Sequence, residues 1–283
     1  MVRDLALGPY QGKETGETAL FREIMGALRK GDVVLGDRVF SSFFGIAELM
    51  NRAVDGLFRL HQRRKYDFNE GRRLGREDQI TVWKKPDRPD WMDEATYAGF
   101  ADEITVRELR VVVTQPGFRV KSLILVTTLT DAEVYTAKEL AALYLQRWTI
   151  ELDLRSIKDV MQMDVLRCKT PEMVKKEIWV GILAYNLIRG VMAQAAKASG
   201  KSPRRISFKG ALQTMTAFGE ALRECEGDDR VALVQALLRA VASHEVGNRF
   251  GRSEPRANKR RPKPQRYLTV PRAEARKSLV GAA

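Results

Sequence analysis

The stretch from Tyr144 to Lys158, YLQRWTIELDLRSIK, combines a polar face with an apolar face. At about 100° per residue, Tyr144, Arg147, Glu151 and Lys158 fall within a helical sector of about 60°. An apolar stripe lies beside them, made of Leu143, Ile150, Leu154, Ile157 and Met161. We therefore expect a helix that seats its apolar stripe on a core and presents one carboxylate among two cations and a phenol. A solvated helix face with spaced charge pairs has the same composition, so the spacing alone leaves both interpretations open.

The composition is that of a basic protein. The 283 residues hold 49 Lys and Arg against 36 Asp and Glu, a formal net charge of +13. Such an excess favours a polyanionic partner, with nucleic acid ahead of a membrane surface. Two cysteines, Cys168 and Cys225, and two histidines, His61 and His244, argue against a zinc site of the usual kind. Apolar runs such as WVGILAY are shorter than the roughly 20 residues of a membrane span, and no signal peptide opens the chain, so we expect a soluble, cytoplasmic protein.

Strand and helix patterns alternate ahead of the 144–158 stretch and predict an α/β fold with a parallel or mixed sheet. The strands are expected at residues 2–10 (VRDLALGPY), 32–37 (DVVLGD) and 56–62 (GLFRLHQ), and the helices at 17–30 and 41–53. Asp37 follows the buried strand directly, at the carboxyl end where ligands bind in such sheets. A turn or cap residue at that position is an equally common role for aspartate.

Two motifs resemble those of one protein family. The spacing Y-(2)-R-(3)-E-(6)-K of the 144–158 stretch resembles the signature of bacterial insertion-sequence transposases of the IS-four family, and GDVVLGDRVF around Asp37 resembles their second acidic motif. The resemblance implies an RNase H-like fold with a DDE triad of carboxylates that holds Mg²⁺ or Mn²⁺. It also implies strand cleavage and transfer at insertion-sequence ends, within a homodimeric synaptic complex that holds transposon-end and target DNA.

The resemblance assigns roles to individual residues. Asp37 and Glu151 would be catalytic metal ligands, whereas Tyr144, Arg147 and Lys158 would hold DNA phosphates. Arg38 would be either a further phosphate contact or an ordinary surface residue.

The chain is expected to divide into five segments. Residues 1–60 would form part of the RNase H-like core with the second acid, and 61–130 a β-rich insertion. Residues 131–200 would complete the core, 201–248 would form a helical cap, and 249–283 a basic, largely extended tail, either solvated or bound along a phosphate backbone. Trp83 and Trp91 in the insertion could stack on a base, but we favour packing under a loop.

The first aspartate of the triad is missing from the pattern. Asp4 is the sole acid before Asp37 in a strand-like setting, and it lacks the expected motif. The resemblance therefore implies an N-terminally truncated transposase without the first strands of its sheet, inactive alone unless an upstream fragment completes it. A non-catalytic DNA-binding remnant of a transposase is the alternative. An RNA-binding protein is a third possibility, although no RNA-binding module is recognisable.

Overall fold

The computed structural model describes residues 1–9, 11–12, 15–113 and 122–247, together with positions 270, 271, 273, 274 and 277. The chain divides into two compact units, Met1–Arg249 and Phe250–Ala283. The predicted basic tail, residues 249–283, lies outside the described residues apart from the five isolated positions.

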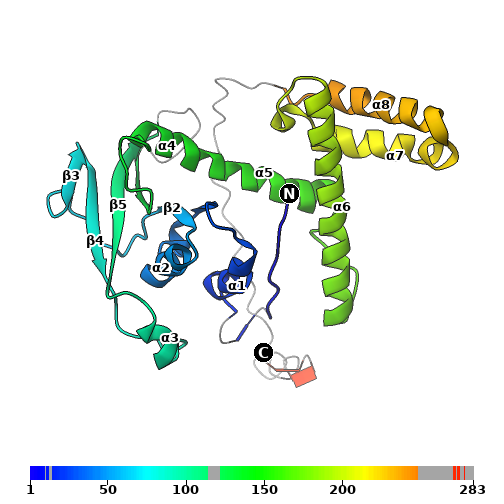
Figure 1. Ribbon diagram of the computed structural model, residues 1–283. Coiled ribbons are helices and arrows are strands. Elements are labelled where there is room, and N and C mark those ends of the chain that lie inside the picture. The colour runs from blue at the N-terminus through cyan, green and yellow to red at the C-terminus, as the bar shows by residue number, and fades with distance from the viewer. Residues whose placement is uncertain are drawn as a thin grey trace. The chain divides into compact units, whose positions relative to one another are not determined.

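A single mixed sheet of six strands, in the order β1-β2-β6-β5-β4-β3, forms the centre of the α/β part (Figure 1). The strands are β1 (Val33–Gly36), β2 (Asp55–Arg59), β3 (Arg72–Gly75), β4 (Asp78–Lys84), β5 (Glu103–Val112) and β6 (Ser122–Thr127). β1 and β2 are parallel and every other pair is antiparallel. The prediction of an α/β fold with a mixed sheet is therefore confirmed.

The strands within residues 61–130 extend the same sheet, because β6 lies between β2 and β5. At the opposite end, β1 is an edge strand, and no strand in the described ranges pairs with its outer side. The division of the chain into five segments stays a prediction.

Helices cover both faces of the sheet because successive side chains of a strand point to opposite sides. In β2, Phe58 packs in the core beneath α2 (Phe43–Asn51), whereas Leu57 packs in a second core with α4 (Ala137–Leu145). Two shorter helices, α1 (Glu17–Ile24) and α3 (Glu94–Ala98), complete this part. Ser42 begins α2 by accepting a hydrogen bond from the Gly45 amide, as expected of an N-cap serine.

The remaining helices are α5 (Thr149–Arg155), α6 (Pro171–Ala198), α7 (Phe208–Glu224) and α8 (Gly227–Ser243). α6, α7 and α8 surround a separate apolar core that includes Tyr185 and Val241. α6 is long and apolar enough, by length and composition, to cross a membrane, with a mean hydropathy of 1.2 over its most apolar window. The core helix of a soluble protein passes the same test, and one face of α6 is buried in this core.

The first residues of the chain differ from expectation. Residues 2–9 form no strand; instead the Val2 amide donates to Asn186 Oδ1 (2.7 Å), and Asn186 Nδ2 donates to the Val2 carbonyl (2.8 Å). The prediction of a strand here was wrong because a side chain of α6, and not a neighbouring strand, satisfies this backbone.

The 144–158 stretch is helical but not one uniform helix. α4 passes through a 3₁₀ turn (Gln146–Trp148) into α5, which ends in a π turn (Ser156–Val160). A 3₁₀ turn advances about 120° per residue, so it rotates everything beyond it relative to a regular helix. The apolar stripe is only partly buried: Ile150 and Leu154 are 53% and 46% exposed and line a cavity with the first residues of the chain.

Candidate active site at the carboxyl ends of β1 and β2

Asp37 occupies the position predicted for it, directly after β1. Its Oδ1 accepts a hydrogen bond from the Arg38 amide (2.7 Å) and caps the 3₁₀ turn Arg38–Phe40. The cap role is therefore confirmed, and it uses one oxygen, whereas the ligand role of Asp37 stays a prediction. The other oxygen, Oδ2, makes no hydrogen bond or ion pair with any residue that the structure describes, and it remains able to bind a ligand.

A cavity of about 200 Å³ brings Asp37 together with Arg59, Tyr144 and Arg147. Arg59 ends β2, and because β1 and β2 are parallel, with Gly36 opposite Phe58, the residues that follow lie at one edge of the sheet. Two arginines against one aspartate give these groups a net charge of +1. Such a pocket attracts an anion while keeping a carboxylate beside it.

Arg59 and Trp148 are lining residues that the sequence analysis missed. The sequence did contain a signal for Arg59, because parallel pairing of DVVLG with DGLFR places Arg59, the last residue of DGLFR, beside Asp37. No pattern in the sequence distinguished Trp148 from a core tryptophan.

Tyr144 is nearly buried and stays a neutral phenol. Burial raises the pKa of Tyr144 above its usual range and Asp37 adds to this effect, whereas the charges of Arg147 and Arg59 oppose it. A neutral hydroxyl can donate a hydrogen bond to an oxyanion. Arg147 adds a second donor: its buried Nε has no hydrogen-bond partner within the described ranges.

Glu151 adjoins this pocket through Arg147 and does not line it. Glu151 Oε1 lies 3.9 Å from Arg147 Nη2, and the glutamate side chain is 50% exposed. Within residues 1–9, 11–12, 15–113 and 122–247, no group of three or more His, Cys, Asp or Glu is placed to hold a metal ion. Asp37 and Glu151 thus offer hard oxygen ligands of the kind that Mg²⁺ prefers, but as a set of two they do not fit a complete site.

Two other predicted residues lie outside the pocket. Arg38 donates from Nη1 to Gln62 Oε1 (2.7 Å) and lines a neighbouring cavity. Lys158 is exposed in the π turn and forms no ion pair with a described residue. Among the tryptophans, Trp83 is 3% exposed and donates from Nε1 to Glu108 Oε1 (2.9 Å), which confirms packing. Trp91 is 41% exposed, with the Arg22 guanidinium over its ring.

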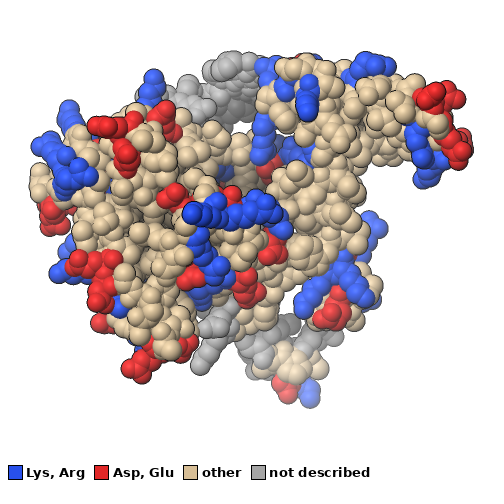
Figure 2. All heavy atoms as spheres, in the orientation of Figure 1, with Lys and Arg blue, Asp and Glu red and all other residues tan. Residues whose placement is uncertain are grey.

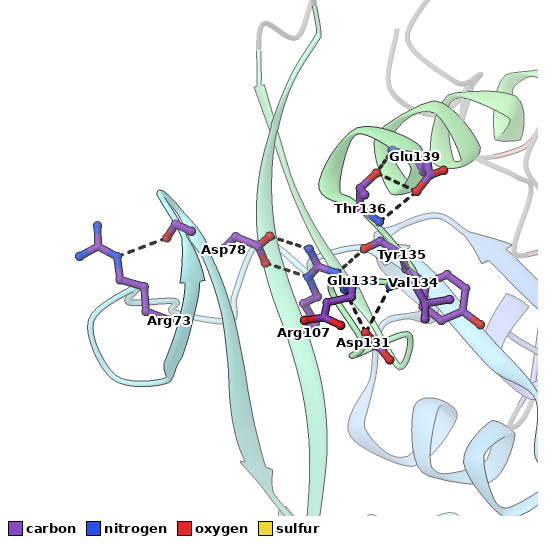
Figure 3. A network of polar contacts seen from close by, with 10 residues as sticks. Arg73, Asp78, Arg107, Asp131, Glu133, Val134, Tyr135, Thr136 and Glu139 are labelled. Atoms are coloured by element: carbon purple, nitrogen blue, oxygen red, sulfur yellow. Dashed lines mark hydrogen bonds and ion pairs between the residues drawn. The ribbon is translucent and has the colours of Figure 1, made fainter.

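A buried ion pair positions the start of α4. Arg107 of β5 forms a bidentate contact with Asp78 of β4, Nε to Oδ1 (2.8 Å) and Nη2 to Oδ2 (2.6 Å). Its Nη1 donates to the Tyr135 carbonyl (2.6 Å), next to the Thr136–Glu139 capping box that begins α4 (Figure 3). The hairpin of β4 and β5 thereby fixes the helix that carries Tyr144.

A second charged group positions α5. Asp153 accepts hydrogen bonds from Arg189 of α6 and from Arg204, whose two Nη atoms lie 2.7 and 3.0 Å from its oxygens. Burial alone would raise the pKa of Asp153, but the hydrogen bond from Arg204 and the charges of Arg189 and Arg204 outweigh it, so the pKa is lowered. The helix that carries Glu151 is thus fastened to α6.

Asp153 gives a pH prediction with a defined sign. Because its pKa is lower in the folded chain than the unfolded value of about 3.9, its stabilisation is fully present above that value and is lost as the pH falls through the folded-state pKa. We expect Asp153→Asn to lower the urea midpoint at pH 7, and the difference from wild type to shrink below about pH 4. Asp159→Asn, which changes an exposed carboxylate paired only with Arg155, is the control. A difference that stays constant with pH would contradict this role.

The fold and the pocket together combine a mixed α/β sheet, a carboxylate after a parallel strand, and two arginines beside it. Residues 10–187 match the family described as "Transposase DDE domain", and the chain belongs to this family. The RNase H-like fold implied by the motifs accords with the mixed sheet.

Two relatives illustrate the match. The chain is 32% identical over 213 residues to the transposase InsG for insertion sequence element IS4 of Escherichia coli (strain K12), covering 74% of this chain and 46% of InsG. It is 35% identical over 86 residues to the transposase for insertion sequence element IS421 of Escherichia coli, covering 30% of this chain and 23% of that protein. The similarity places the chain among IS4-family transposases. The chain spans about half the length of InsG and less of the IS421 protein.

Proposed function

We propose that this chain carries out metal-dependent DNA strand cleavage and transfer at insertion-sequence ends. The observation that supports this most directly is the cavity in which Asp37, Arg59, Tyr144 and Arg147 meet at the edge of the sheet. A carboxylate beside two arginines suits a phosphodiester, because the arginines attract its charge and the carboxylate remains available as a metal ligand. A tyrosine that stays protonated acts there as a hydrogen-bond donor.

In this proposal Asp37 and Glu151 are ligands of Mg²⁺ or Mn²⁺, which when bound would activate the attacking oxygen and stabilise the leaving one. Arg147, Arg59 and Tyr144 hold the non-bridging oxygens of the scissile phosphate. Because Arg147 shares the cavity with Asp37 and lies 3.9 Å from Glu151, it would orient the phosphate relative to both.

Lys158 and Arg38, which lie outside the pocket, contact phosphates further along the DNA. The reaction takes place in the cytoplasm, and two copies of the chain hold the two element ends in one complex. Exposed apolar side chains on α6, including Val180, Leu183 and Leu187, are available for contact between copies.

We further propose that the site needs a third carboxylate from a polypeptide segment outside these residues. The two acids fall short of a triad, and the open edge of β1, with Val33 39% exposed, offers unpaired backbone groups to an additional strand. A strand added there parallel to β1 would end beside Asp37. The chain by itself would then bind DNA but cleave it poorly.

A cleavage assay tests the proposal. We expect the purified chain to bind labelled element-end duplexes, and to nick them with Mg²⁺ or Mn²⁺ only when co-expressed with a segment that carries a strand-borne aspartate. Mixing long and short end duplexes reports complexes that hold two ends. Arg147→Ala should weaken binding and cleavage about tenfold or more because it removes a phosphate contact. Arg155→Ala, on the exposed face of α5, is the control.

Two results would contradict parts of this proposal. Nicking by the chain alone, abolished by Glu151→Ala, would mean that its own residues complete the site. Equal binding and cleavage by the Arg147 and Arg155 variants would rule out the pocket as the phosphate site.

A non-catalytic DNA-binding protein derived from a transposase is the second candidate. The absence of a three-ligand metal group among the described residues favours it. It predicts salt-sensitive DNA binding that survives both Glu151→Ala and the removal of divalent metal, with no cleavage under any condition.

A further inference from the structure

Two more cavities continue from the Asp37 pocket along the same edge of the sheet. The first, of about 200 Å³, shares Arg59 and Leu123 with that pocket. The second, of about 610 Å³, shares His61 and Arg64 with the first. The three cavities therefore adjoin one another through common lining residues, and in this order they mark out a path, called the depression below, from Asp37 to the start of α2.

The lining of these two further cavities is cationic. Arg38, Arg59, Arg64 and Arg110 line the first, Arg63, Arg64 and Lys65 line the second, and no acidic residue lines either. Among described residues, Arg59, Arg63, Arg64 and Lys65 form no ion pair. Elsewhere acidic side chains gather where α7 meets α8, at Glu224, Glu226, Asp228 and Asp229 (Figure 2). Arg110 pairs with Glu77 (2.6 Å) and Arg64 lies within the influence of the buried Glu108, so the excess positive charge of the depression comes from Arg59, Arg63 and Lys65.

Arg64 is held rigidly within this lining. Its guanidinium carbon lies 3.6 Å from the centre of the Trp83 ring, and Trp83 is itself fixed by its hydrogen bond to the buried Glu108. Burial lowers the pKa of Arg64, although Glu108 opposes the shift. A cation that is desolvated in this way gains more from an incoming anion than a fully hydrated one does.

We propose that this depression, the 59–65 track, binds the sugar-phosphate backbone of a DNA strand that leads away from the Asp37 pocket. Cations spaced through adjoining cavities match a repeated anion, whereas a small anion would occupy one cavity only. Tyr66, 42% exposed in the lining of the middle cavity, offers a ring on which a base can stack. The track extends the proposed function, because it names the path of the substrate beyond the reacting phosphate.

Binding measurements on the full chain without divalent metal test the track. The probes are a fluorescein-labelled duplex of random sequence and the matching single strand. We expect Arg63→Ala with Lys65→Ala, two exposed residues, to weaken binding roughly tenfold and to reduce the slope of log affinity against log salt by about 1.4 to 1.8. Lys209→Ala with Arg239→Ala removes the same charge from exposed positions on α7 and α8, and should change the slope by much less.

Equal slopes and affinities for the two double variants, with both probes, would overturn the track. The binding measurement involves no cleavage, so its result is separable from that of the cleavage assay, which tests the proposed function. If the track variant loses binding while cleavage is independent of Glu151, the proposed function fails and the track stands. If cleavage depends on Glu151 but the track variant binds like its control, the track fails and the function stands.

Discussion

Replacing Glu151 with glutamine is expected to reduce strand cleavage at insertion-sequence ends by about 10² to 10³-fold while leaving DNA binding unchanged. The glutamate is half exposed on α5, and its one ion pair with a described residue is the 3.9 Å approach of Arg147. Its removal therefore leaves no buried partner unsatisfied, and the free energy of unfolding should change by less than about 0.5 kcal/mol. Any loss of activity then reflects the loss of the carboxylate and not a loss of stability. The measurement is the single-turnover cleavage rate, in the preparation that includes the segment supplying the third carboxylate.

The matched control for Glu151 is Asp159→Asn. Asp159 lies two turns further along the same helical stretch, is 63% exposed, and pairs with Arg155 at a similar four-residue spacing. The Asp159→Asn variant should cleave DNA at the wild-type rate. Equal rates for the Glu151 and Asp159 variants would show that Glu151 is an ordinary solvated residue, the interpretation that its spacing first left open.

Replacing Arg107 with alanine should cost about 3 to 5 kcal/mol of stability, the largest effect we expect from one substitution on the fold. The guanidinium is 1% exposed, and its removal would leave the Asp78 carboxylate buried, 12% exposed, without a partner. It would also free the Tyr135 carbonyl beside the first turn of α4. The measurement is chemical denaturation. Arg52→Ala, which breaks an exposed pair with Glu48 in α2, should cost less than about 1 kcal/mol.

A double variant separates the effect of the ion pair on the stability of the fold from its effect on the position of α4. Arg107→Met with Asp78→Leu removes both charges and should recover most of the lost stability, because apolar side chains of similar volume often replace a buried ion pair without cost. The contact with Tyr135 would still be missing. Amide hydrogen exchange in the first turn of α4 should therefore remain faster than in wild type. A stability loss below about 1 kcal/mol for Arg107→Ala would contradict the importance of this pair.

Local sequence patterns predicted the elements around the site. Strand patterns located β1 and β2, and helix patterns located α1, α2 and the helical 144–158 stretch. These features depend on neighbouring residues in the chain, so a local reading captures them. The strand predicted at the start of the chain was wrong for the same reason: a local strand pattern does not ensure that a neighbouring strand is there to pair with it.

The sequence by itself determined the family, the α/β class, and the placing of Asp37 after a strand and of Glu151 on a helix, although the strand, predicted to be buried, is a partly exposed edge strand. The tertiary structure alone decided which of these groups meet: parallel pairing brings Arg59 beside Asp37, and Arg147 lines the pocket whereas Glu151 does not. The reason is physical. Strand and helix signals arise over a few residues, whereas the pocket depends on strand register and on small rotations of the backbone that no short pattern encodes.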